Sequence, residues 1–141
     1  KRELNKLNLR VYLHSSYKRA LKNTDIYLVD TYGETNKFYN LSNSVFLGGS
    51  IINHGGQNPL EPARLGCKIL HGPHISNFKE IYDLLGDYKI SKKVNNSNKL
   101  YSNLSIILKK NVSSEKSINK LKKLGNKILS SSLVEIKKYI K

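Results

Sequence analysis

Short apolar runs alternate with helical patterns along residues 9–86, and Gly-rich turns separate them. The predicted strands cover residues 9–13, 25–29, 44–47 and 67–70, and the predicted helices cover residues 33–41, 58–65 and 77–85. Strand, loop and helix repeat in this order, which is typical of parallel strands joined by right-handed crossovers. Ligands of such sheets bind where the strands end, at their carboxyl edge. The sequence therefore predicts an α/β fold with a parallel sheet.

The pattern changes after Gly86. A short strand at 88–94 is expected to precede three helices, at 98–110, 114–129 and 133–140. In the second of these helices, apolar residues recur at steps of three and four and form one stripe beneath a Lys-rich face. No segment reads as a linker between domains. We expect residues 1–141 to form a single, partial lobe, with 88–141 as its helical, Lys-rich part.

Basic residues concentrate in this last third. Of a net charge of +15, most comes from fourteen lysines after residue 87, which face only Glu115 and Glu135. Such a block could attract nucleic acid, anionic lipid headgroups or an acidic acceptor, or could simply reflect a Lys-rich surface composition. The block contains no Arg and no aromatic residues interleaved at a stacking spacing, which argues against nucleic acid. We expect peripheral attraction to an anionic membrane.

Several function classes find little support in the composition. No apolar run approaches the roughly 18 residues that a membrane-spanning helix needs. Cys67 begins an apolar run and reads as a strand residue rather than a nucleophile, and a single Cys forms no internal disulfide. His54, His71 and His74 lie in Gly/Pro loops without zinc-site spacing, so we expect no metal and no cofactor. Because the chain opens on Lys1 without an initiator Met, we expect a fragment of a longer protein.

One loop, Gly55–Pro62, carries the strongest sign of a binding site. Two permissive glycines precede Asn58, which can cap a helix, and Pro59, which fits a first helical turn. Such a helix start binds anions through free N–H groups, and Glu61 could accept hydrogen bonds from sugar hydroxyls. The loop suits a nucleotide or nucleotide-sugar. An ordinary Gly-rich turn between a strand and a helix remains the alternative from spacing alone.

Other motifs accompany this loop in a fixed order. The series runs Asp30–Glu34 (DTYGE), Phe46–Ser50 (FLGGS), Gly55–Pro62 (GGQNPLEP) and Gly72–Phe78 (GPHISNF). This series closely resembles the carboxyl-terminal half of the Kdo transferases, which attach 3-deoxy-D-manno-octulosonic acid (Kdo) to lipid A precursors. The resemblance covers roughly residues 9 to 86, and it rests on several motifs that agree in identity, order and spacing.

The resemblance implies a Rossmann-like lobe with helices on both faces of the sheet, the carboxyl-terminal half of a GT-B glycosyltransferase. That lobe binds the CMP part of the donor CMP-Kdo, while the amino-terminal lobe, which this chain does not match, holds the acceptor site and the general base. No catalytic residue is therefore expected here. The implied donor-binding residues are Gly33, Glu34, Thr35, Gly48, Gly49, Ser50, Gly55, Gly56, Gln57, Asn58, Pro59, Leu60, Glu61, Pro73, His74 and Asn77.

The resemblance also implies the setting of the whole enzyme. It would transfer Kdo to a lipid A precursor at the cytoplasmic face of the bacterial inner membrane, in lipopolysaccharide core biosynthesis. One departure is Gln57, which stands where the family usually has His, so a neutral donor remains but a protonatable one is lost. The family's Pro-Arg-His motif would lie upstream of Lys1.

Two alternatives stay open at this point. One is another GT-B transferase or an epimerase that uses a UDP-sugar, since a Gly-rich loop with a downstream Glu recurs across that fold. The other is a noncatalytic basic module that binds anionic membrane or RNA through residues 88–141.

Overall fold

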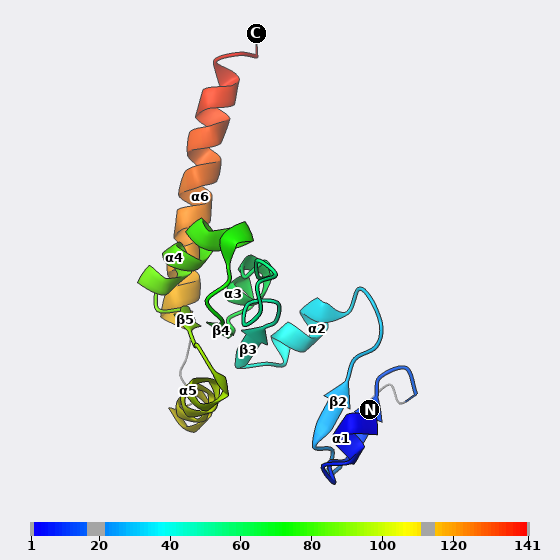
Figure 1. Cartoon of the computed structure of the whole chain (residues 1–141). Coiled ribbons are helices and arrows are strands. Elements are labelled where there is room, and N and C mark those ends of the chain that lie inside the picture. Colours follow the sequence, from blue (N-terminus) through cyan, green and yellow to red (C-terminus); the bar gives the residue numbers. More distant parts are fainter. Residues whose placement is uncertain (1, 17–21, 111–114, 141) are drawn as a thin grey trace. The chain divides into compact units, whose positions relative to one another are not determined.

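The computed structural model describes residues 2–16, 22–110 and 115–140. The chain divides into two compact units, residues 1–35 and 36–141, each of which is described by itself. Parallel strands occur in both units (Figure 1). The predicted α/β class is confirmed.

The first unit contains a helical turn, α1 (Arg2–Asn5), and two parallel strands, β1 (Val11–Leu13) and β2 (Ile26–Leu28). An ion pair joins the residues just before these strands. Arg10 Nε donates to Asp25 Oδ2 at 2.9 Å, and the Arg10 backbone N–H donates to the same oxygen at 2.9 Å. These charge-assisted bonds lower the pKa of Asp25 to about 2. The pair therefore aligns the entry of both strands.

The second unit contains a three-stranded sheet in the order β3 (Ser44–Leu47), β4 (Lys68–His71) and β5 (Ser91–Lys93). All pairings are parallel, so the carboxyl ends of β3 and β4, which are Leu47 and His71, lie side by side. The loops that leave these ends must consequently meet at one edge of the sheet.

Helices follow the strands in the expected alternation. They are α2 (Thr35–Asn40), α3 (Leu60–Arg64), α4 (Lys79–Asp87), α5 (Ser97–Lys110) and α6 (Glu115–Lys137), with a 3-10 turn, η1 (Ser76–Phe78), before α4. The core of the unit combines sheet residues such as Leu47 and Ile69 with Tyr82 and Leu85 from α4. Burial of each of these side chains contributes roughly 1.5–3 kcal/mol, so α4 is firmly held to the sheet.

Two helix starts differ from the prediction. Gly33 has a φ of +81°, outside the right-handed helical region, and α2 begins only at Thr35. The expected start of α3 at Asn58 moves to Leu60, because Asn58 and Pro59 form the turn that precedes the helix. Both differences are local effects of turn chemistry that the apolar pattern does not register.

The predicted strand 88–94 shrinks to Ser91–Lys93 because α4 ends later than expected. Lys89 adopts a φ of +56°; its N–H donates to the carbonyl of Gly86, and the N–H of Ile90 donates to that of Leu85. This pair of bonds is a Schellman motif, which closes the end of a helix and occupies the first residues of the expected strand.

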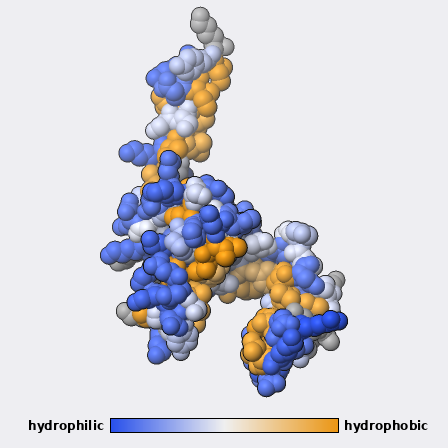
Figure 2. All heavy atoms as spheres, viewed as in Figure 1, coloured by the Kyte–Doolittle hydropathy of each residue, from blue (hydrophilic) through white to orange (hydrophobic). Residues whose placement is uncertain are grey.

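The two helices expected at 114–129 and 133–140 are one continuous helix, α6. Three serines at 130–132 lie between the two apolar patterns, but Ser costs only a few tenths of a kcal/mol in a helix and no Pro interrupts the run. The first half of α6 packs through Leu121 against the core. Residues 125–140 are exposed, and their apolar side chains form the orange stripe seen on α6 in Figure 2.

Candidate functional site

The loops that leave β3 and β4 are joined by a buried hydroxyl. Ser50 is fully buried, and its Oγ donates to the Leu47 carbonyl at 2.6 Å and accepts from the Gly72 N–H at 2.8 Å. The Ser50 carbonyl in turn accepts from the His74 N–H at 2.9 Å. A side chain at Gly72 would lie 2.0 Å from that carbonyl oxygen, so only Gly fits there. Ser50 thus fixes the two loops against each other.

The paired glycines make a second junction between the same loops. Gly55 and Gly56 have φ values of +85° and +78°, which other residues adopt only with strain. A Cβ on Gly55 would lie 2.4 Å from the side chain of Asn77. The backbone N–H of Asn77 donates to the Gly55 carbonyl at 3.2 Å. The Gly56 N–H donates to the Gly49 carbonyl at 3.1 Å. The glycines are therefore required both for backbone conformation and for close approach.

The start of α3 has the character that the sequence predicts. Asn58 Oδ1 accepts a hydrogen bond from the Leu60 N–H at 3.0 Å, so the Asn caps the first turn. Pro59 is buried, and Glu61 is an exposed acid of that turn. The carboxylate of Glu61 is thus accessible to a ligand.

In the first unit, Glu34 has partners that the sequence motifs do not predict. His14 Nε2 lies 2.6 Å from Glu34 Oε2, and Thr31 Oγ1 donates to the same oxygen at 2.7 Å. The other ring nitrogen of His14 is 2.8 Å from the Tyr27 hydroxyl. A carboxylate held in this way is oriented before any ligand arrives.

Ser15 and Asp30 form a similar pair beside this cluster. Ser15 donates to the Asp30 carboxylate through its N–H at 3.0 Å and its hydroxyl at 2.7 Å, and these bonds lower the pKa of Asp30. His14 and Ser15 directly follow β1, and Asp30 lies just after β2. Polar residues that follow two predicted strands are the sequence signal for this cluster, and His14 and Ser15 carry it as Asp30 and Glu34 do.

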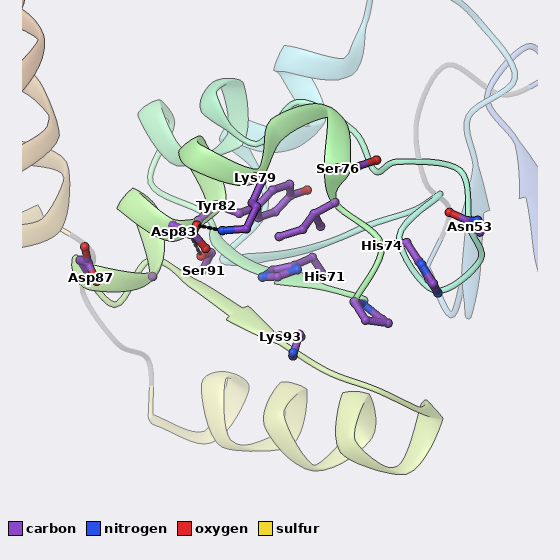
Figure 3. A pocket seen from close by; sticks show the side chains of 13 residues that line it. Asn53, His71, His74, Ser76, Lys79, Tyr82, Asp83, Asp87, Ser91 and Lys93 are labelled. Atoms are coloured by element: carbon purple, nitrogen blue, oxygen red, sulfur yellow. Dashed lines mark hydrogen bonds and ion pairs between the residues drawn. The ribbon is translucent and has the colours of Figure 1, made fainter.

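A cavity of about 640 Å³ opens beside the carboxyl ends of β4 and β5 (Figure 3). The buried side chain of His71 lies in the wall of this cavity, and its ring centroid is 4.3 Å from that of Tyr82. The Tyr82 hydroxyl donates to the Gln57 carbonyl at 2.9 Å. His71 Nδ1 is 2.7 Å from the Gly72 carbonyl, a distance at which it is the N–H donor. Burial lowers the pKa of His71, so the ring is neutral and its Nε2 is an acceptor.

The structure brings most of the predicted residues together in the second unit. Gly48, Gly49, Ser50, Gly55, Gly56, Gln57, Asn58, Pro59, Leu60 and Glu61 come from the β3 loop and α3, and Pro73, His74 and Asn77 come from the β4 loop. Gly33, Glu34 and Thr35 belong to the first unit and are described separately from these. The cavity includes Pro73 and His74 but not the start of α3, so the predicted site extends beyond it. The donor-binding role of each residue stays a prediction.

Cys67 lies just before β4 rather than in the strand expected at 67–70, and it has a structural role. The residue is fully buried, and its Sγ donates to the carbonyls of Tyr39 and Ser42 at 3.2 and 3.3 Å. Burial raises the pKa of the thiol, which disfavours the nucleophilic thiolate. Within residues 2–16, 22–110 and 115–140, no group of three His, Cys, Asp or Glu side chains could hold a metal ion.

Comparison with known proteins places these features in context. No protein-family model matches the chain. The 3-deoxy-D-manno-octulosonic acid transferase of Rickettsia felis is 30% identical over 138 residues, which are 94% of this chain and 30% of that protein. The enzyme of the same description from Haemophilus influenzae is 38% identical over 76 residues, which are 54% of this chain and 18% of that protein. The chain thus spans less than a third of the length of these relatives.

A solved structure agrees with the present fold. It is the C-terminal CMP-Kdo binding domain of WaaA from Acinetobacter baumannii, with a TM-score of 0.76 and 28% sequence identity over 84% of this chain and 62% of that chain. Parallel strands with helices on both sides, together with this match, define the carboxyl-terminal lobe of a GT-B glycosyltransferase. The relatives narrow the class further. The chain corresponds to the carboxyl-terminal lobe of the Kdo transferases.

Proposed function

We propose that this lobe binds the CMP moiety of CMP-Kdo, and that the protein to which it belongs transfers Kdo from this donor to a lipid A precursor. The observation that carries the proposal is the match to the CMP-Kdo binding domain of WaaA over 84% of the chain. The Gly-rich loops at the carboxyl edge of the β3–β4–β5 sheet support it, because ligands of parallel sheets bind at this edge.

The chemistry of the loops fits a nucleoside monophosphate. At the start of α3, the Glu61 N–H and the positive end of the helix dipole favour a phosphate, and the exposed carboxylate of Glu61 can accept hydrogen bonds from ribose hydroxyls. Gly48 leaves room for a ligand against the main chain, because no atom lies within 4 Å of where its Cβ would be, and Gln57 offers a neutral donor. The contribution of this lobe to transfer would be electrostatic, namely stabilisation of the departing CMP phosphate.

The general base that deprotonates the acceptor hydroxyl and the acceptor groove belong, on this proposal, to the amino-terminal lobe of the enzyme. The proposed location is the cytoplasmic face of the inner membrane, with peripheral contact to anionic lipid through the Lys-rich residues 88–141. Within the part of the chain that the structure describes, no helix is long and apolar enough to cross a bilayer.

Titration calorimetry of CMP with Glu61→Gln tests the nucleotide site. The substitution keeps the shape of the side chain but removes its charge-assisted hydrogen bonds, so CMP binding should weaken by roughly 1–3 kcal/mol. Glu80→Gln is the matched control, because Glu80 is also an exposed acid in the first turn of a helix, α4. The control should leave CMP affinity unchanged.

Equal CMP affinity in wild type and Glu61→Gln would indicate that the Gly55–Pro62 loop is an ordinary turn before a helix. UMP provides the second comparison. Binding of UMP as tight as that of CMP would favour a transferase or epimerase that uses a UDP-sugar.

A further inference from the structure

A second cavity, of about 650 Å³, lies between the sheet and the helices α5 and α6. Four lysines line it, from β4, the turn after α4, β5 and α6: Lys68, Lys89, Lys92 and Lys120. Asp87 is the one carboxylate among the described residues that line the cavity. A hollow lined mainly by one sign of charge concentrates its field and attracts ions of the opposite sign.

This cavity adjoins the first one, because Gly86, Asp87 and Ser91 line both. The two cavities differ in their lysines. Lys89 and Lys92 line only the second cavity, whereas Lys93 lines only the first. Glu61, at the start of α3, lines neither cavity. Substitutions of Lys89 or Lys92 therefore change the second cavity and not the proposed contacts of CMP with Glu61.

Lys68 is the least ordinary of these lysines. It begins β4 and is partly buried, and burial lowers the pKa of its ammonium group. Its Nζ donates to the Lys89 carbonyl at 3.0 Å. An ammonium group carries three donors, so two remain to be satisfied by water or by an anion in the cavity.

Lys89 occupies a position where Gly is usual. With a φ of +56° it is the left-handed residue of the Schellman motif that closes α4. A side chain in this conformation costs stability relative to Gly. The chain nevertheless has Lys there, in the wall of the cavity and with its carbonyl bound to Lys68. A cost of this kind is expected where the side chain serves binding.

The α5 side of the cavity is mainly apolar. Ile106 and Ile107 line it together with Asn103, and Ile106 is 51% exposed. A ligand that satisfies the whole cavity must therefore combine an anionic group for the lysines with an apolar part for the isoleucines. A free nucleotide or a metal-binding group offers no such apolar part, whereas a phosphate-bearing lipid offers both.

We propose that this cavity binds the headgroup of a phosphate-bearing lipid, with phosphate oxygens at Lys68, Lys89, Lys92 and Lys120 and the start of an acyl chain on Ile106 and Ile107. The inference deepens the proposed peripheral contact with an anionic membrane by giving that contact a site. It does not depend on CMP binding.

The probe is lysophosphatidic acid at concentrations at which it is monomeric. The measurement is the titration of this lipid into the 141-residue chain. Lys89→Gly should weaken binding about two- to fivefold, the usual effect of one exposed charge. The same variant should unfold at a higher temperature than wild type, because Gly relieves the left-handed strain. A loss of binding in a more stable protein has no explanation in unfolding.

Two further comparisons use matched controls. Lys92→Ala should weaken the binding of lysophosphatidic acid as Lys89→Gly does. Lys99→Ala should not weaken this binding, because Lys99 is an exposed α5 lysine outside the cavity. Ile106→Ala should also weaken the binding of lysophosphatidic acid. Leu108→Ala should leave this binding unchanged, because Leu108 is 60% exposed on the same helix but does not line the cavity. CMP affinity should be the same in all five proteins.

Other ligands separate the sources of the anionic group. Lysophosphatidylcholine should bind poorly, and glycerol 3-phosphate, which lacks the acyl chain, should bind more weakly than lysophosphatidic acid and be insensitive to Ile106→Ala. Vesicles of phosphatidylglycerol with phosphatidylcholine should retain wild type more than Lys89→Gly. Equal binding of the two lysolipids, or equal binding of glycerol 3-phosphate and lysophosphatidic acid, would overturn the proposal. Equal loss in Lys99→Ala and Lys92→Ala would do the same, because it would indicate a diffuse surface charge.

Discussion

Replacement of Ser50 by Ala should destabilise the second unit and disturb the donor site together. The Ser50 hydroxyl is fully buried and makes two short hydrogen bonds, to the Leu47 carbonyl at 2.6 Å and from the Gly72 N–H at 2.8 Å. Ser50→Ala leaves this buried N–H without its partner. An orphaned buried group of this kind costs about 1–3 kcal/mol, and the lost bond to Leu47 adds about 0.5–1.5 kcal/mol.

The expected total is therefore about 1.5–4.5 kcal/mol of unfolding free energy. For a chain of this length, that loss corresponds to a fall of the thermal midpoint by roughly 5–15 °C. Urea unfolding followed by circular dichroism measures the free energy, and the slope of the transition indicates whether the native state has loosened. Because Ser50 holds the β3 and β4 loops together, CMP affinity should also fall at temperatures where the variant remains folded.

Ser76→Ala is the matched control. Ser76 is an exposed residue at the start of η1, and its replacement should change stability by no more than about 0.5 kcal/mol. If Ser50→Ala and Ser76→Ala had the same unfolding free energy, the argument that a buried hydroxyl joins the two loops would be refuted.

Two predictions concern pH. The folded-state pKa of Asp25 is lowered to about 2 by Arg10, so its contribution to stability is present above its ordinary pKa of 3.8 and is lost as the pH falls towards 2. Acid titration of unfolding should show this loss in wild type, and Asp25→Asn should flatten it; identical curves would contradict the role of the ion pair. Burial lowers the pKa of His71 below 6.5, so protonation favours the unfolded chain and stability should decline as the pH falls below about 6.5. His71→Gln should reduce this decline, and an undiminished pH dependence in the variant would count against a buried neutral ring.

The sequence determined the elements and their order. Apolar runs with period two or with steps of three and four identify strands and helices, and the bounds of β3 at Ser44–Leu47 agree with the prediction to the residue. The parallel arrangement also agrees with the alternation, because parallel neighbours need a crossover connection, which a helix supplies. Motifs that occur in a fixed order pointed to the family in the same way, since they are local in the chain.

The ends of the elements were less predictable, because they depend on single turns. Gly33 with its positive φ delays α2, and the Schellman motif at Lys89 lengthens α4 at the expense of β5. The serines at 130–132 resemble a break, yet α6 passes through them. Backbone conformation at one residue decides each case, and hydrophobic periodicity carries no information about it.

Only the tertiary structure decided which polar groups are available to a ligand. Ser50 and Asn77 read as site residues in the sequence, but the Ser50 hydroxyl is used within the protein and the Asn77 side chain packs on Gly55. His14 drew no attention, yet it lies against Glu34. Lysines that appear in the sequence as a uniform basic tail become, in part, the wall of one cavity. Such partners are distant in the chain and are brought together by sheet register and helix packing, which local sequence patterns do not specify.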